Sequence, residues 1–378
     1  MLQALFHAWE RRLASIAKDR VVRPFDWGLD WVPEPGDRNG AAPEAILRDW
    51  VARVMSDTDA FFTPEPTAEY RVSSRTGARD ERRLTFPSAL RTPHPENNTV
   101  HCRLFPAHGR AARRAGDRRT NGAGRSAGSS CRAAVVVLPQ WNSEPGGHVG
   151  LCRLLAMNGM TALRLTLPYH DQRMPPELTR ADYIVSANIA RTLQVCRQAV
   201  LDARRAVAWL AQEGFDRIGI LGSSLGSCLS LLTTAHEPLI RAQALNHISP
   251  YFADVVWRGL STRHVREGID GHIELDLLRH LWSPISPACY LERLRERQTL
   301  LVYARYDLTF PVDLSEELVR QFQDLTIPHE VAVLRCGHYS TGKTPFKFVD
   351  GYVLTRFLKT ALLADSGRPW RPATSPLV

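Results

Sequence analysis

Three residues of this sequence have the types and the chain order that nucleophilic hydrolysis requires. The first is Ser224, in the pentapeptide GSSLG between the apolar run RIGIL and the apolar segment SCLSLLTTA. A serine hydroxyl is a poor nucleophile until a neighbouring base takes its proton. The pattern G-x-S-x-G between a strand and a helix is typical of a nucleophile elbow, which exposes the serine at a helix N-terminus. We therefore predict a catalytic role for Ser224, with a plain helix cap as the alternative.

The base and the acid are expected just after later strands. His338 follows the apolar run EVAVLRCG, and Asp307 follows TLLVYARY. A histidine at the site can take the serine proton, and a carboxylate can hold the imidazole tautomer and stabilise its charged form. The order Ser224, Asp307, His338 is the order of an elbow-type hydrolase. Asp254, in SPYFADVVW after the preceding strand, is a second candidate acid.

Two backbone N–H groups are candidates for an oxyanion hole, which stabilises the charge that develops on the attacked carbonyl oxygen. One belongs to Leu225, the residue after the candidate nucleophile. The other is expected in the loop after the run AAVVVLP, where Trp141 is the candidate and Gln140 the alternative. Gln140 is also a candidate for the substrate pocket. A packing role would equally suit the side chain of Trp141.

Further candidates for a substrate pocket lie in two segments. In LPYHDQRMP, His170 and Arg173 could contact a polar or anionic part of a substrate, or an internal salt bridge could brace the loop. Residues 249–297 are helix-like and rich in aromatic residues, which predicts a cap or lid over the site or a purely structural cap. The pocket candidates in this cap are Tyr251, Trp257 and Trp282.

The elements that must position these residues alternate along the chain. Apolar strands alternating with helices over residues 81–365 predict a mainly parallel central sheet with helices on both faces. A first strand pair is expected at 84–90 and 100–107. Later strands are expected at 133–139, 160–168, 217–222, 241–249, 299–307 and 330–338. Helices are expected at 147–158, 183–213 and 311–325, and two more end near 236 and 364.

Residues 1–80 form an extension before this catalytic domain. Apolar residues at helical spacing near the N-terminus predict an amphipathic helix that docks on the core, with a membrane surface as the alternative. They are Leu2, Leu5, Phe6, Trp9, Leu13 and Ile16. A second helix is expected at 43–55. Residues 109–130, rich in Arg, Gly and Ser, are predicted to be a disordered loop, and 366–378 a flexible tail.

Composition narrows the class of protein. The chain of 378 residues carries a net charge of +9. Six arginines and one aspartate in 109–130 supply a net +5 of it, so we predict no nucleic-acid partner. Seven cysteines without a C-x-x-C pair are typical of free thiols, and neither a membrane span nor a secretory signal is evident, so a cytoplasmic location is expected. The motifs indicate no metal and no cofactor.

The chain resembles the α/β-hydrolase superfamily over roughly residues 84–365, on GSSLG, YARYD and CGH in that order. More narrowly, it is similar to bacterial members of the α/β-hydrolase domain-containing protein 18 family. The segments that carry this likeness are LPQWNSEPGGH, LRLTLPYHDQRMP, ILGSSLG and HYSTGKTPFKFVDGY. The resemblance implies an acyl-ester hydrolase with Ser224, Asp307 and His338 as its triad. The chain departs from the pattern of these relatives in two places. One is the Arg-rich segment, and the other is LPQWN, where many relatives in the superfamily have a His-Gly pair.

The prediction from the sequence is therefore a serine carboxylesterase that acts on small or medium acyl esters through an acyl-enzyme. Its expected partner is a small-molecule ester. Two alternatives remain at this stage, a lipid or phospholipid deacylase at a membrane surface and a non-catalytic binding protein on a hydrolase scaffold. The sequence does not determine the alcohol part of the substrate ester or the oligomeric state.

Overall fold

A computed structural model describes the chain except for residues 18, 34–39, 75–80, 109–131 and 365–378. The loop predicted at 109–130 and the tail predicted at 366–378 therefore lie outside the described residues.

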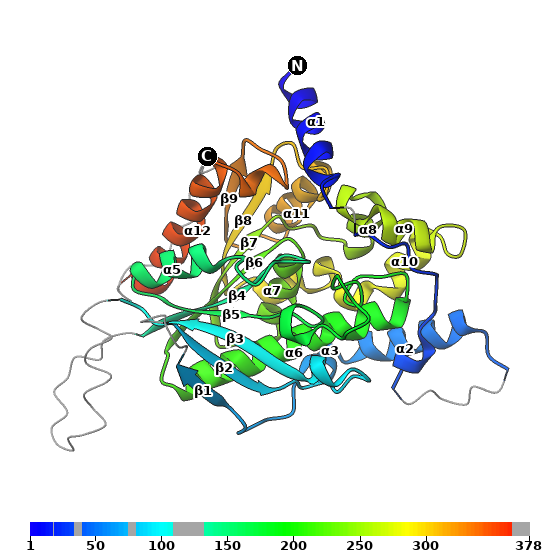
Figure 1. The fold of residues 1–378 in the computed structure, drawn as a ribbon, viewed down its shortest axis with the longest axis horizontal. Helices are drawn as coiled ribbons and strands as arrows, with labels where there is room; N and C mark the ends of the chain where they lie inside the picture. Colours follow the sequence, from blue (N-terminus) through cyan, green and yellow to red (C-terminus); the bar gives the residue numbers. More distant parts are fainter. Residues whose placement is uncertain (18, 34–39, 75–80, 109–131, 365–378) are drawn as a thin grey trace.

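A nine-stranded sheet runs through the centre of the described chain, in the order β1-β2-β3-β5-β4-β6-β7-β8-β9 (Figure 1). Neighbours from β1 to β5 pair antiparallel, and all neighbours from β5 to β9 pair parallel. The strands are β1 (Arg71–Ser74), β2 (Arg82–Pro87), β3 (Thr99–Phe105), β4 (Ala133–Leu138), β5 (Thr161–Leu165), β6 (Arg217–Ser223), β7 (Ile240–Asn246), β8 (Gln298–Ala304) and β9 (His329–Leu334). This arrangement confirms the mainly parallel sheet predicted from the alternation of strands and helices.

Helices cover both faces of the sheet, because the central parallel strands are apolar on both sides. In β4, Val135 and Val137 face one core, whereas Val136 and Leu138 face the other, as a period of two requires. The first core includes α5 (Val149–Met157) and α12 (Phe346–Leu363). The second includes α6 (Ile189–Gln212), α7 (Leu225–His236) and α11 (Val312–Asp324).

One helix boundary differs from the prediction. The helix expected from residue 183 begins at Ile189, because Asn188 caps it. The Asn188 side chain accepts a hydrogen bond from the backbone N–H of Arg191 at 2.9 Å, which satisfies one of the free donors of the first turn. Its amide also donates to Asp26 at 2.6 Å and so connects the helix to the N-terminal extension.

Both helices predicted in the extension form. α2 (Pro43–Ser56) buries one apolar face in the second core, whereas α3 (Thr58–Phe62) was not predicted. α1 (Leu2–Ala14) docks through its C-terminal half, where Glu10 and Ala14 are buried. Its first turns face solvent, because residues Leu2 and Leu5 are 58% and 64% exposed.

Residues 249–297 are helical, as expected. They form α8 (Phe252–Arg258), η5 (Leu260–Thr262), α9 (Arg263–Ile269), α10 (Leu275–Leu281), η6 (Ser283–Ile285) and η7 (Pro287–Leu294). Within the described ranges, we find no helix with both the length and the apolar character needed to cross a membrane.

Candidate active site

Ser224 lies at a strained turn between β6 and α7. Its backbone has φ 55° and ψ −121°, a region that residues with a side chain rarely adopt. The turn is held by hydrogen bonds from the Ser224 N–H to the Asn246 carbonyl and from the Ser227 N–H to the Ser224 carbonyl, both 2.8 Å. This geometry is that of a nucleophile elbow, with the serine at a helix N-terminus where the positive end of the dipole favours developing negative charge.

The two glycines of GSSLG let the elbow approach the neighbouring backbone. A Cβ at Gly226 would lie 2.6 Å from the Pro139 carbonyl oxygen and closer still to that of Leu138, at the end of β4. A Cβ at Gly222 would collide with the backbone of Gly226. Glycine is therefore required at both positions of this turn.

Asp307 and His338 are hydrogen-bonded to each other. His338 Nδ1 lies 3.0 Å from Asp307 Oδ2. The other carboxylate oxygen accepts from the backbone N–H groups of Thr309 at 2.7 Å and Phe310 at 2.8 Å. Burial alone would raise the pKa of Asp307, but the two histidines that it faces hold this pKa far below its usual range. The carboxylate is thus ionised and fixed, and it directs the Nδ1–H of His338 so that Nε2 is free to accept a proton.

The environment of His338 favours its charged form. Burial lowers the pKa of the imidazole, but the negative charge and the hydrogen bond of Asp307, together with the charge of Glu10, outweigh burial and raise it. The Phe310 ring stacks on the imidazole with centroids 5.4 Å apart. No hydrogen bond joins Ser224 Oγ to His338 in the described part of the chain. Such contacts are often long in a free enzyme and shorten when substrate binds.

A second histidine shares the same carboxylate and was not predicted. His247 follows β7 directly, with φ 57°, and its Nδ1 lies 2.9 Å from Asp307 Oδ2. Its ring is 4.6 Å from that of His338, centroid to centroid, and its carbonyl accepts from the Ser227 hydroxyl at 2.7 Å. His247 therefore connects the elbow to the acid. The signal in the sequence was its place at the end of a predicted strand, as for the other site residues.

His247, Asp307 and His338 also offer three potential metal ligands whose atoms lie within 4.8 Å of one another. Hydrogen bonds account for this arrangement without a metal. Both imidazoles direct Nδ1 at one carboxylate oxygen, at 2.9 and 3.0 Å, and the other oxygen accepts two backbone N–H groups. A Nδ1 atom that donates its proton to Asp307 has no lone pair to give to a metal, and this holds for both rings.

The loop after β4 places Trp141 beside the elbow. Trp141 borders the same pocket as Ser224 and Leu225, and its indole N–H donates to the Ala181 carbonyl at 2.8 Å. The next backbone N–H along the chain, that of Asn142, donates a hydrogen bond to His170 Nε2 at 2.9 Å. The side chain of Gln140 is half-buried and does not border this pocket.

The pocket beside Ser224 is small and its walls are mainly apolar, with about 40 Å³ of free space. Residues of α8 and η5 supply much of its wall, so the segment predicted as a cap borders the site. The lining residues are Trp141, Val185, Ser224, Leu225, Cys228, Ser249, Tyr251, Phe252, Val255, Val256, Ser261, Thr262 and Phe310.

Of the three pocket candidates in the cap, the structure places one in the pocket wall. Tyr251 lines the pocket, and its hydroxyl accepts from the Gln321 amide at 2.9 Å. Trp257 lies under the guanidinium of Arg266, 4.9 Å from the ring centroid. Trp282 is fully buried and donates to the Ile189 carbonyl at 3.1 Å. These two tryptophans support the cap from outside the pocket wall.

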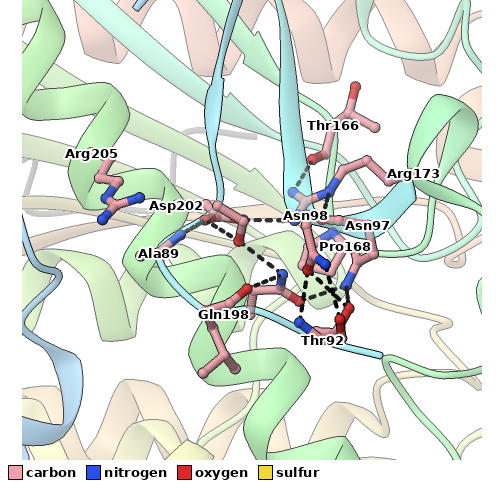
Figure 2. Close-up of polar contacts among 12 residues, drawn as sticks. Ala89, Thr92, Asn97, Asn98, Thr166, Pro168, Arg173, Gln198, Asp202 and Arg205 are labelled. Carbon is pink, nitrogen blue, oxygen red and sulfur yellow. Dashed lines mark hydrogen bonds and ion pairs between the residues drawn. The ribbon is translucent and has the colours of Figure 1, made fainter. Parts of the chain in front are cut away.

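The loop LPYHDQRMP has a bracing role. Arg173 is fully buried and forms an ion pair with Asp202 of α6 at 2.8 Å, within a polar network that includes the carbonyls of Asn97 and Thr166 (Figure 2). The structure thus places Arg173 away from the pocket, in the internal salt bridge that was the alternative. Burial lowers the pKa of His170 to about 4, so its neutral ring can accept from Asn142 and hold the Trp141 loop.

The second candidate acid lies elsewhere. Asp254 pairs with Arg279 through both carboxylate oxygens, at 2.6 and 2.9 Å. Because the Asp254 carboxylate is paired with Arg279, Asp307 is the acid that the fold brings to His338.

Comparison with known proteins identifies the fold. No protein-family model matches the chain, and no curated protein matches it by sequence. Solved structures do match it. The chain superposes with a TM-score of 0.56 on the acetyl xylan esterase from Paenibacillus sp. R4, at 14% identity, covering 88% of this chain and 98% of that one. Acetyl xylan esterase 1 from Thermoanaerobacterium sp. JW/SL YS485 gives 0.56 and 14%, with coverages of 92% and 98%.

A third match is longer than this chain. Pyrococcus horikoshii acylaminoacyl peptidase superposes with a TM-score of 0.55 at 13% identity over 72% of this chain, which spans only 41% of the peptidase. At such identities a likeness shows the fold alone. With the sheet order and the elbow, these matches show that the chain has the α/β-hydrolase fold.

Proposed function

We propose that this protein is a serine carboxylesterase for small or medium acyl esters. One observation carries the proposal: a serine on a strained elbow and a hydrogen-bonded Asp307–His338 pair follow the carboxyl ends of parallel strands in one sheet. Ligand sites of open α/β sheets lie at this edge. A nucleophile, an oriented base and a fixed acid at one place form the set that acyl transfer requires.

The mechanism uses each group once in each half of the reaction. Ser224 Oγ attacks the ester carbonyl while His338 Nε2 takes its proton, and Asp307 stabilises the imidazolium. The backbone N–H groups of Leu225 and Trp141 bind the oxyanion. His338 then protonates the departing alcohol, which leaves an acyl-enzyme on Ser224. Water, deprotonated by His338, attacks the acyl group and releases the acid.

Pocket size supports a small acyl group. An apolar cavity of about 150 Å³ admits a benzene ring, whereas the free space beside Ser224 is about 40 Å³. The walls offer aliphatic and aromatic carbon from Val255, Val256 and Phe310. Esters of short acids therefore suit the pocket better than long-chain ones.

A lipid deacylase at a membrane surface is the second candidate function. The exposed side chains of Leu2 and Leu5 on α1 favour it, since an amphipathic helix can lie in a membrane interface. Co-sedimentation with liposomes separates the two. Loss of binding in a variant with Leu2→Ser and Leu5→Ser supports the membrane function, and absence of binding by the unaltered chain supports an enzyme for small esters.

We further propose a cytoplasmic location and a small-molecule ester as the partner, without a nucleic-acid partner. Free thiols at Cys102, Cys152, Cys196, Cys228, Cys289 and Cys336 support the location, because reducing compartments keep cysteines unpaired.

Active-site labelling tests the function directly. A fluorophosphonate reacts with activated serines, and peptide mass spectrometry locates the adduct. We expect the adduct on Ser224 and its loss in Ser224→Ala. Ser223→Ala is the matched control, because Ser223 is the adjacent serine and its hydroxyl contacts His148 instead, at 3.0 Å. A folded wild-type protein that takes no label and hydrolyses no ester supports a non-catalytic binding protein.

A further inference from the structure

A buried carboxylate from the N-terminal helix reaches the loop that carries the candidate base. Glu10 of α1 has no exposed surface, and its two oxygens accept hydrogen bonds from the backbone N–H groups of Tyr339 and Ser340, at 2.8 and 2.9 Å. These are the two residues that follow His338. Figure 1 shows α1 beside the segment that joins β9 to α12.

Glu10 contacts this loop on the other side of His338 as well. A Cβ added to Gly337 would lie 2.5 Å from Glu10 Cγ and 2.6 Å from Oε1. The carboxylate therefore lies directly against the backbone that precedes His338, and it is hydrogen-bonded to the backbone that follows. Placing an ion in the protein interior is costly unless strong donors satisfy it, so this contact has to form with good geometry.

Neighbouring side chains of the extension strengthen the contact. Phe6 stacks on Tyr306, the residue before Asp307, with ring centroids 4.6 Å apart and planes inclined by 11°. Arg20 donates to the Tyr339 hydroxyl at 3.1 Å. The extension thus touches both the turn of the acid and the loop of the base.

We propose that Glu10 is a positioning residue for His338, so that α1 forms part of the catalytic machinery. The inference rests on the proposed function. Two backbone hydrogen bonds and the close fit at Gly337 set the path of the loop, and with it the direction of the imidazole toward Ser224 and Asp307. The Glu10 carboxylate also adds to the negative charge that raises the pKa of His338.

Glu10→Gln is the first test. Glutamine keeps the shape, but it removes the charge and turns one acceptor into a donor that faces a backbone N–H. We expect kcat for p-nitrophenyl acetate to fall about 10- to 100-fold, the scale of a misplaced catalytic group, with KM nearly unchanged. Glu267→Gln, on the exposed face of α9, is the matched control and should retain full activity.

The pH profile separates positioning from a merely structural role. The ionisable groups that face His338 are Asp307, His247, Glu10 and Tyr339. Removing the Glu10 charge should move the acid limb of kcat/KM to lower pH, because the neutral imidazole is the active form. Glu10→Asp keeps the charge and shortens the reach, so its kcat should fall while the acid limb stays near that of the wild type.

The outcomes are distinct from those that test the function itself. If wild-type Ser224 takes no fluorophosphonate, the proposed esterase fails and the inference with it. If the wild type is labelled and active, while Glu10→Gln and Glu10→Asp lower only the melting temperature and leave kcat and the acid limb unchanged, Glu10 is structural and the inference alone is overturned.

Discussion

Replacement of Asp307 by asparagine should inactivate the proposed esterase by selecting the wrong tautomer of His338. The structure determines how the new amide must lie. One carboxylate oxygen of Asp307 accepts from the backbone N–H groups of Thr309 and Phe310, so the asparagine oxygen has to take that place. The NH₂ group then faces the Nδ1 atoms of His247 and His338. An imidazole that accepts at Nδ1 carries its proton on Nε2, which can no longer receive one from Ser224.

The expected loss of kcat/KM follows from the free-energy cost of turning the new amide to its opposite orientation. Turning the amide to restore the active tautomer would leave two buried N–H donors unsatisfied, at about 1–3 kcal/mol each. The sum of about 2–6 kcal/mol corresponds to a fall in kcat/KM of about 30-fold to 10⁴-fold. The upper end matches the loss that this substitution causes in serine peptidases, about 10⁴-fold.

The assay is kcat/KM for p-nitrophenyl acetate between pH 5 and 10. In the wild type, activity should rise with pH through the raised pKa of His338, since only the neutral base can take the serine proton. In Asp307→Asn the remaining activity should rise at lower pH, because the charge that raised this pKa is gone. Asp254→Asn is the matched control, a buried carboxylate paired with Arg279. Loss of activity in Asp254→Asn, with Asp307→Asn still within tenfold of the wild type, would refute the reasoning.

Three further results are expected. Gly226→Ala should lower the free energy of unfolding in urea by about 1–3 kcal/mol through its clash with Pro139, whereas Gly150→Ala, in open space on α5, should raise it slightly. Dialysis against EDTA should leave kcat within twofold, and zinc-dependent recovery of lost activity would instead indicate a metal on His247. Val256→Phe should reduce the butyrate-to-acetate ratio of kcat/KM about tenfold, because the ring fills a pocket with about 40 Å³ free; an unchanged ratio would show that the acyl group binds elsewhere.

The fold class and the position of the elbow could be predicted from local sequence patterns. Each candidate site residue lies within four positions of a strand end, so Ser224, Asp307 and His338 could be placed without any knowledge of packing. Parallel strands then bring these positions to one edge of the sheet. The expected strand pair before the parallel strands also formed, but β5 inserts between β3 and β4, because sheet order is a property of long-range pairing.

The pocket residues were harder to predict because they depend on how short helices turn relative to one another. Trp257 and Trp282 lie in the segment that borders the pocket, yet their rings point to Arg266 and to Ile189. A helix of seven residues presents only two turns, and no periodicity in that length tells which face meets the site. Arg173 was ambiguous for a different reason, because its partner Asp202 lies on a helix 29 residues away in the chain.

Glu10 illustrates the kind of residue that no local pattern reveals. Its partners lie 329 and 330 residues along the chain, and the spacing of apolar residues in α1 says only that one face is covered. A charged residue on that face contradicts the amphipathic pattern, and such conflicts between local pattern and fold are expected at functional sites. The conflict disappears once the two N–H groups beside His338 are known, because they are the donors that make a buried carboxylate tolerable. The N-terminal extension and the candidate base are therefore best understood as one structural unit, although the chain separates them by almost its whole length.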